Sequence, residues 1–177
     1  MRNIILYIAV SLDGYIADCN SSVNWIKGHD ETVETTDTFT PFFNAVDTVI
    51  MGRRTYNQIA TELSPDEWPY NGATTYVLTR RADLADTENI RFRDTDVCRL
   101  TEELKEQPGK NIWICGGADI ACQLIEKNAI DIYHLAIIPV ILGSGIRLFA
   151  TQSPEIELRL TESKTYNGIT ELVYTRR

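Results

Sequence analysis

Hydrophobic residues recur along this chain in short runs that are separated by polar turns. Residues 4–10 are almost all apolar and rich in β-forming side chains, which predicts a strand buried on both faces. Later runs of the same character predict strands over 48–51, 74–79, 111–115 and 130–138. Segments with helical character lie between them, at about 36–45, from Gly52 through Ile59, over 98–106 and from Gly116 through Ile125.

The C-terminal part of the chain breaks this alternation of strand and helix. Two strands, about 156–166 and 169–176, are joined there by Asn167-Gly168, a dipeptide that favours a type I′ hairpin turn. The order of elements predicts an α/β fold with a mainly parallel central sheet, helices on both faces and an antiparallel C-terminal hairpin. The 177 residues contain no repeat or linker, so residues 1–177 are expected to form one domain.

Composition narrows the class of protein without identifying a function. The formal net charge is −8, whereas a duplex nucleic-acid binder is usually basic, so no nucleic-acid partner is expected. No apolar run is long enough to span a membrane. Asp13-Gly14 interrupts the first apolar run, whereas the apolar region of a signal peptide is continuous, so we expect a buried strand there. Four cysteines without a CxxC pair and only two histidines predict no metal site and suit the cytoplasm.

Unusual residues follow two of the predicted strands, at the place where ligands bind in open α/β sheets. Segment 52–55, Gly-Arg-Arg-Thr, combines a glycine, a hydroxyl and two fixed positive charges. Segment 79–81, Thr-Arg-Arg, offers a hydroxyl and two guanidinium groups that can hold a phosphomonoester. Each segment also fits an ordinary turn with solvated arginines.

A third junction carries the glycine pair Gly116-Gly117, between the strand at 111–115 and a predicted helix. Two glycines that open a helix let backbone N–H groups approach a pyrophosphate, although such a pair also serves as a tight turn. The three junctions together indicate one extended ligand with phosphates at several points, and a dinucleotide fits that description.

The residues at these junctions, in their order along the chain, resemble the dihydrofolate-reductase-like superfamily. Within it they are most similar to stand-alone bacterial proteins that resemble the C-terminal reductase domain of the riboflavin-biosynthesis deaminase–reductase. Four segments carry the resemblance and cover nearly the whole chain: Ala9-Val-Ser-Leu-Asp-Gly-Tyr-Ile-Ala17, Met51-Gly-Arg-Arg-Thr-Tyr56, Ile114-Cys-Gly-Gly-Ala118 and Ile138-Pro-Val-Ile-Leu-Gly-Ser-Gly-Ile-Arg-Leu-Phe149. The resemblance implies the three-layer fold of the superfamily, a cis peptide in the glycine pair and reduction by NADPH.

The resemblance also implies where the cofactor binds. Ala9 and Ile16 would hold the nicotinamide through backbone groups, and Arg53 would face the 2′-phosphate. No carboxylate ends the strand at 74–79, which favours NADPH over NADH. The full set of implied cofactor-binding residues is Ala9, Ile16, Gly52, Arg53, Arg54, Thr55, Leu78, Thr79, Arg80, Gly116, Gly117, Ala118, Asp119 and Ile120.

The carboxylate with which dihydrofolate reductases bind the pterin has no single counterpart in this sequence. Trp25 stands where the family has its loop tryptophan, and counting onward from it leads to Asp30. Counting back from Gly52 leads to Asp37 instead. The carboxylates Asp30, Glu31 and Asp37 therefore all stay open, and Trp25, Asp30 and Asp37 are the catalytic candidates. Each carboxylate also fits a charged loop or a helix start.

The substrate expected from the resemblance is a small heterocycle, foremost the ribosylated aminopyrimidine of riboflavin biosynthesis, with dihydrofolate as the alternative. The HxE and PCxxC motifs of the associated zinc deaminase are absent. The phosphate of that substrate needs a cation, for which Lys27 and Arg147 are candidates. A different class, a protein that binds NADPH or folate without efficient catalysis, stays open, and the stand-alone relatives favour a homodimer.

Overall fold

The computed structural model describes residues 2–33, 36–81, 83–149 and 153–177. Within them an eight-stranded sheet has the strand order β5-β4-β3-β6-β1-β7-β10-β9. Its strands are β1 (Ile4–Ser11), β3 (Val46–Gly52), β4 (Thr74–Leu78), β5 (Ile90–Arg93), β6 (Asn111–Gly116), β7 (Ile132–Ile138), β9 (Leu158–Tyr166) and β10 (Ile169–Arg176). A small second sheet pairs β2 (Tyr15–Ala17) with β8 (Ile146–Arg147).

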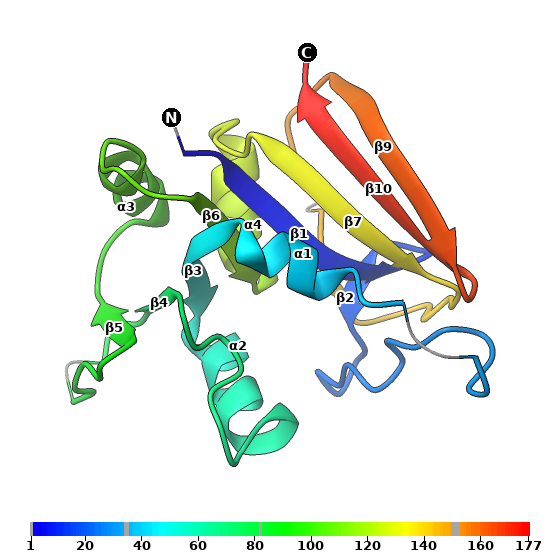
Figure 1. The fold of residues 1–177 in the computed structure, drawn as a ribbon, viewed down its shortest axis with the longest axis horizontal. Coiled ribbons are helices and arrows are strands. Elements are labelled where there is room, and N and C mark those ends of the chain that lie inside the picture. Colours follow the sequence, from blue (N-terminus) through cyan, green and yellow to red (C-terminus); the bar gives the residue numbers. More distant parts are fainter. Residues whose placement is uncertain (1, 34–35, 82, 150–152) are drawn as a thin grey trace.

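β1 occupies the middle of the large sheet, as its uninterrupted run of apolar residues predicts. It pairs in parallel with β6 on one side and with β7 on the other. β10 and β9 are antiparallel and form the C-terminal hairpin (Figure 1). Asn167 and Gly168 at its turn have φ of 44° and 77°, the two positive values that a type I′ turn needs. The mainly parallel sheet and its antiparallel C-terminal hairpin are therefore confirmed.

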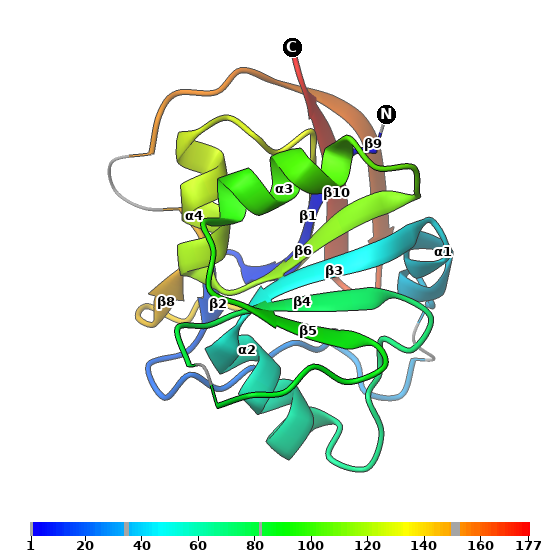
Figure 2. The ribbon, with the colours of Figure 1, turned by 90° about the vertical axis from the view of Figure 1, so that its left-hand side faces the viewer.

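Helices cover both faces of the sheet (Figures 1 and 2). α3 (Val97–Lys105) and α4 (Ala118–Glu126) lie on one face, while α1 (Phe39–Asn44) and α2 (Arg53–Gln58) lie on the other. α2 continues as a π-helix, η1 (Ile59–Leu63). None of the helices in the described part of the chain has the length and apolar character that crossing a membrane requires.

A separate hydrophobic core fills each interface between the sheet and its helices. On the α3–α4 side, Leu6 and Ile114 of the sheet pack with Leu124 of α4, and all three are fully buried. On the α1–α2 side, Met51 and Trp113 pack with aromatic residues that include Phe39, Phe42, Phe43 and Tyr56. The expected three layers, a helix layer on each face of one sheet, are confirmed.

Two features depart from the expectation. The helix expected over 36–45 begins only at Phe39, because Thr38 is its N-cap and donates its hydroxyl to Glu171 (2.6 Å). β5 and the β2–β8 pair were not expected at all. β5 reads Ile-Arg-Phe-Arg, with only two apolar residues, so its pattern is too short to stand out from the polar segment around it.

Candidate functional site

The glycine pair lies at the carboxyl end of β6, where α4 begins. Gly116 has a φ of +131°, a conformation that residues with a side chain rarely adopt, and the bond to Gly117 is a cis peptide. Gly117 is the N-cap of α4 and provides no side-chain cap, so the first turn of α4 presents backbone N–H groups. Such N–H groups and the positive end of the helix dipole favour an anion.

The junction after β3 adjoins this glycine pair, because β3 and β6 are neighbouring strands. A Cβ atom added to Gly117 would lie 3.4 Å from the hydroxyl oxygen of Thr55, and one added to Gly52 would lie 3.5 Å from Ile120 Cγ1. Backbone and hydroxyl groups of the two junctions therefore border one space. This arrangement forms a cradle that side chains on the glycines would fill.

Arginines without a carboxylate partner follow the neighbouring strands β3 and β4. Arg53 is half-buried at the start of α2, and Arg54 and Arg80 are exposed. None of the three forms an ion pair with any residue that the structure describes. In a chain with a net charge of −8, three unpaired guanidinium groups give this edge of the sheet a local positive charge, which favours an anion such as phosphate.

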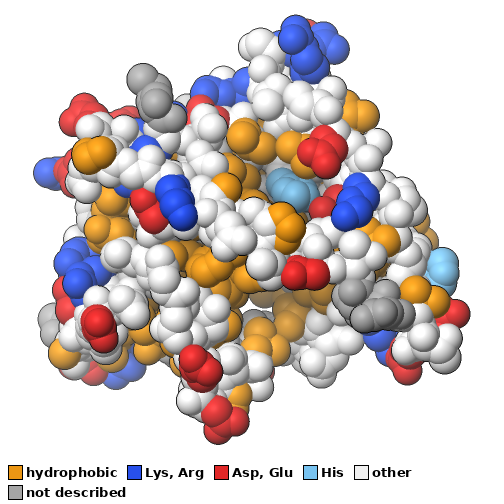
Figure 3. Space-filling model, viewed as in Figure 1, with side chains coloured by type: hydrophobic (Ala, Val, Ile, Leu, Met, Phe, Trp, Pro, Cys, Tyr) orange, Lys and Arg blue, Asp and Glu red, His pale blue; other side chains and the backbone are white. Residues whose placement is uncertain are grey.

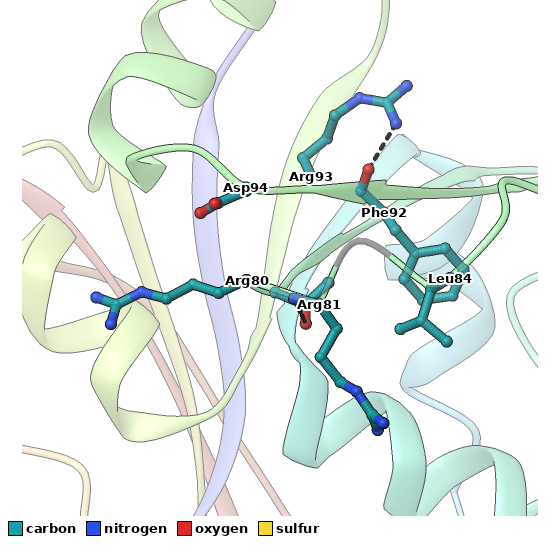
Figure 4. A pocket seen from close by; sticks show the side chains of 7 residues that line it. Arg80, Arg81, Leu84, Phe92, Arg93 and Asp94 are labelled. Atoms are coloured by element: carbon teal, nitrogen blue, oxygen red, sulfur yellow. Dashed lines mark hydrogen bonds between the residues drawn. The ribbon is translucent and has the colours of Figure 1, made fainter.

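A cavity of about 200 Å³ lies beside Arg80, at the ends of β4 and β5. Figure 4 shows Arg80 and Arg81 on one side of it, Arg93 and Asp94 on the other, and Leu84 with Phe92 at its apolar end. Arg81 pairs with Asp83 (3.2 Å) and Arg93 with Asp86 (3.0 Å). The predicted Thr79 lines this cavity too, and Leu78 precedes it at the end of β4. An apolar wall next to guanidinium groups suits an adenine and its ribose phosphate.

Sequence reasoning missed the β5 side of this cavity. Phe92 and Arg93 contribute to it, and β5 was not expected. The available signal was the alternation of Ile90 and Phe92 with two arginines, which is the period-2 pattern of an edge strand.

The expected nicotinamide end of the site lies one strand further along, on β1. Ala9 packs against a buried cluster of Ala136, Ile138 and Ile169, and Trp25 of the loop at 18–33 packs against the same cluster. The indole N–H of Trp25 donates to the backbone oxygen of Ser22 (3.1 Å), within its own loop. The structure thus brings the loop tryptophan to the sheet surface that carries Ala9.

The two candidate carboxylates lie apart from each other. Asp30 is held at the hairpin turn, where its backbone N–H donates to Asn167 Oδ1 (3.0 Å), and the hydroxyl of Thr32 lowers its pKa. Asp37 precedes α1, and the backbone N–H of Thr40 lowers its pKa. The charged form of both carboxylates is therefore favoured, whereas a carboxyl group must be protonated before it can donate a proton.

Asp13, in the turn after β1, has a structural set of partners. Its carboxylate accepts hydrogen bonds from the hydroxyl of Ser11 (2.7 Å) and from the backbone N–H groups of Leu142 (3.1 Å) and Gly143 (2.7 Å). The Ser11 hydroxyl is the main cause that lowers the pKa of Asp13, to about 2. Asp13 thereby ties its turn to the segment that follows β7.

A buried carboxylate that the sequence analysis did not single out lies on the α1 face of the sheet. Glu171 of β10 is 4% exposed and bonds to His134 of β7 and to hydroxyl groups of Tyr166 and Thr38. Figure 3 shows that this face of the molecule is hollowed and that hydrophobic side chains line the hollow. The available signal was one acidic residue in an apolar strand, in the run Ile169-Thr-Glu-Leu-Val.

Comparison with known proteins identifies the family to which the chain belongs. A family model described as RibD C-terminal domain matches residues 2–172. The chain is 39% identical over 175 residues to the uncharacterised protein YwjB of Bacillus subtilis (strain 168), covering 99% of this chain and 98% of that protein. It is 31% identical over 183 residues to the uncharacterised protein YyaP of the same organism, covering 98% and 94%.

Solved structures share the fold. A Shewanella sp. PV-4 protein named for riboflavin biosynthesis has a TM-score of 0.82 and 24% identity, and the match covers 100% of this chain and 99% of that one. A diaminohydroxyphosphoribosylaminopyrimidine deaminase/5-amino-6-(5-phosphoribosylamino)uracil reductase from Thermotoga maritima has a TM-score of 0.70 and 15% identity. That match covers 99% of this chain but 57% of the Thermotoga protein.

Proposed function

Because the chain belongs to the family of the RibD C-terminal domain, we propose that it is an NADPH-dependent reductase that transfers hydride to a small heterocyclic substrate. The family itself supports the coarser statement, an oxidoreductase of the riboflavin-biosynthesis reductase type. One observation of the structure carries the finer statement. The glycine cradle after β6 and the unpaired arginines after β3 and β4 lie at one edge of the sheet.

The residues at this edge fit an extended NADPH molecule. Segment 116–120 would seat the pyrophosphate at the start of α4, with Gly52 and Thr55 beside it. Arg53, Arg54 and the pair Thr79–Arg80 would take the 2′-phosphate end, and the cavity next to Leu78 would take the adenine. Ala9 and Ile16 would hold the nicotinamide through their backbone groups.

Bound NADPH supplies the hydride, and the residues of the chain orient both reactants and exclude water. Backbone groups of β1 and β2 would fix one face of the reactive ring. Trp25 would cover the Ala9 surface when the loop at 18–33 closes, as lid segments do in other enzymes. Exclusion of water strengthens every electrostatic contact in the closed site.

The substrate that we propose first is 5-amino-6-(5-phosphoribosylamino)uracil, which the name of the Thermotoga relative includes. Its phosphate needs a cation near Ile16. Arg147 meets this need, since it pairs with Tyr15 across β2 and β8 and forms no ion pair with the described residues. Lys27, in contrast, already pairs with Glu31 (2.7 Å). Dihydrofolate is the second candidate, because Trp25 stands where that family keeps a tryptophan and either Asp30 or Asp37 would supply its carboxylate.

Titration of intrinsic fluorescence with NADPH and with NADH tests the cofactor assignment. We expect NADPH to bind at least about tenfold more tightly than NADH, because an added phosphate forms charge-assisted bonds with arginine. The affinity for NADPH should also fall as salt is raised. Equal affinities, or no binding of either, would contradict the proposal. Turnover of the aminouracil and of dihydrofolate then separates the two substrates, and binding without turnover would favour a cofactor-binding protein.

A further inference from the structure

Glu171 is a buried carboxylate on the face of the sheet that α1 covers. The proposed cofactor site does not use it. Its Oε1 accepts from the hydroxyl groups of Tyr166 (2.6 Å), Thr38 (2.6 Å) and Tyr7 (3.4 Å), and its Oε2 is 3.0 Å from His134 Nε2. Burying a charge without such partners is strongly unfavourable. The chain therefore gathers four side chains from β1, α1, β7 and β9 around one buried carboxylate.

The register of the sheet places this cluster beside the expected nicotinamide contact. Ala9 of β1 lies opposite Ala136 of β7, which in turn lies opposite Glu171 of β10. Tyr7 and His134 form the adjacent pair on the same face, two residues earlier on each strand. Two alanines thus lie side by side in this row, and Trp25 packs against the buried cluster that contains Ala136. The Glu171 cluster borders this alanine row.

His134 is the member of the cluster with a ring nitrogen that the other members do not bind. Its ring stacks on Tyr7, with centroids 4.2 Å apart and an angle of 30°, and Phe42 meets it edge-on. Its Nε2 is engaged by Glu171, whereas Nδ1 forms no hydrogen bond with any residue described in the structure. The side chain is 15% exposed, so the ring is in partial contact with solvent. A carboxylate on one ring nitrogen leaves the other to exchange protons.

The electrostatics of the cluster keep its other members in fixed protonation states. Burial alone would raise the pKa of Glu171, but hydrogen bonds from Thr38, Tyr166 and His134 hold it below its ordinary value. Burial and the Glu171 carboxylate raise the pKa of Tyr166 to about 12, and burial raises the pKa of Tyr7. At neutral pH the carboxylate is therefore charged and both phenols are protonated.

Two further charged groups face this cluster. Asp37, ahead of α1, adds to the rise in the pKa of Tyr7. Lys164 of β9 lies opposite Glu171, with its Nζ 5.9 Å from the centre of the Tyr166 ring. Neither forms a hydrogen bond with His134, so the Glu171 carboxylate is the charged group in direct contact with the imidazole.

We propose that His134 is the proton donor of the reduction and that Glu171 is the positioning residue that orients its imidazole. This proposal rests on the proposed function and concerns the other half of the same reaction. Opening of the ribose ring breaks the bond between the anomeric carbon and the ring oxygen, which becomes a hydroxyl as the nitrogen gives up its proton, and a C=N bond forms. When hydride adds to the carbon of this C=N bond, the dihydronicotinamide is oxidised and the π electron pair moves to nitrogen. The nitrogen forms its new N–H bond with the proton on Nδ1 of the imidazolium. The neutral imidazole then regains a proton from water.

The assignment differs from the carboxylates that sequence counting suggested. The carboxylates of Asp30 and Asp37 bond to Thr32 and Thr40 of their own segments. His134 lies two residues before Ala136 on β7, beside the alanine row, and Glu171 contacts its ring. A histidine also changes charge near neutral pH, as a general acid that must be reloaded in each cycle requires.

The pair can be tested without cofactor, because the chain has only two histidines. Ring ¹⁵N spectra of histidine-labelled protein contain two ring systems, and His29→Gln assigns the remaining one to His134. We expect neutral His134 to carry its proton on Nε2, because the Glu171 carboxylate accepts a hydrogen bond there. In Glu171→Gln the share of this tautomer should fall, because the charged acceptor of the Nε2–H is lost. A proton on Nδ1 in the wild type, or tautomer populations that do not change in Glu171→Gln, would overturn the proposal.

Kinetics with 5-amino-6-(5-phosphoribosylamino)uracil and NADPH test the chemical role. His134→Gln keeps an N–H group that can reach Glu171, so its affinity for NADPH should equal that of the wild type. Its kcat should fall about 10²- to 10⁴-fold and lose the decline of the wild type at rising pH. In Glu171→Gln, that decline should move to lower pH, because the carboxylate that favours the protonated imidazole is lost.

The outcomes separate the two proposals. A wild type that reduces the aminouracil, with a His134→Gln variant of equal kcat and equal pH profile, would overturn the His134 assignment alone. A wild type that binds no NADPH would overturn the proposed function and the assignment with it.

Discussion

An arginine near the end of a strand can indicate a site for an anionic ligand. The examples in this chain are Arg53, Arg54 and Arg80. Each lies within two residues of the end of a parallel strand, and none has a carboxylate partner among the described residues. Arg81, next to Arg80, and Arg93, at the end of β5, do have such partners. The difference marks the first three as positive charges available to a ligand. Arg53 is the most enclosed of them, at the start of α2.

Replacement of Arg53 tests its role toward the 2′-phosphate. In Arg53→Ala we expect the Kd of NADPH to rise about ten- to hundredfold, since a hydrogen bond to a charged group contributes about 1.5–3 kcal/mol. The Kd of NADH should change much less. Fluorescence titration measures both, with Arg159→Ala on β9 as a control of equal charge change. Equal weakening of NADPH and NADH would contradict the 2′-phosphate role.

The sequence indicates residues whose types carry chemistry next to a recognisable turn, such as Gly52, Arg53 and the glycine pair. It does not indicate His134 or Glu171, which lie inside strands where any residue alternates between faces. Their meaning depends on which strands are neighbours and in which register. Tyr7, His134 and Glu171 meet only because β7 lies between β1 and β10.

Among the elements, the turn between β1 and β2 depends on one side chain. Asp13 joins it to the segment after β7 through the amides of Leu142 and Gly143. The backbone adds two bonds between the same segments, from Leu12 N to Val140 O (2.9 Å) and from Leu148 N to Gly14 O (3.0 Å). Ile16, which we propose as a nicotinamide contact, follows this turn in β2, so the bonds of Asp13 help to position that end of the proposed site.

The low pKa of Asp13 predicts a dependence of stability on pH. Its folded pKa of about 2 lies below its unfolded value of about 4, so its contribution to stability is present above pH 4. That contribution is lost as the pH falls from about 4 to about 2. The Tm of the wild type should therefore decline more steeply over this window than the Tm of Asp13→Asn. Calorimetry checks this, with the exposed Asp66→Asn as a control that should keep the wild-type slope.

Long elements with a strong pattern were predicted, and short ones were not. β1, α3 and α4 follow the sequence expectation to within about two residues, as hydrophobic periodicity allows. β5 and β8 have four and two residues, which is too few for a period to be visible. These two strands are defined by pairing with a neighbour, β5 with β4 and β8 with β2.

At the scale of the whole molecule, the C-terminal hairpin leaves β9 at one edge of the sheet. Its side chains are largely exposed, and Leu160 is 50% exposed. We expect a homodimer through this region, so Leu160→Asp should shift the protein toward the monomer in sedimentation velocity. Leu63→Asp is the matched control, since Leu63 of η1 is 52% exposed and lies elsewhere. A wild type that sediments as a monomer at every concentration would contradict the dimer.

The central place of β1 has a consequence for synthesis on the ribosome. β1 emerges first, yet both of its partners come much later, since β6 begins at Asn111 and β7 at Ile132. The most apolar strand of the chain therefore remains without a neighbour until residue 111 has been made. Unpaired apolar strands invite aggregation and are a target for chaperones. The nascent chain thus has to be protected at its N-terminal end until the later strands can enclose it.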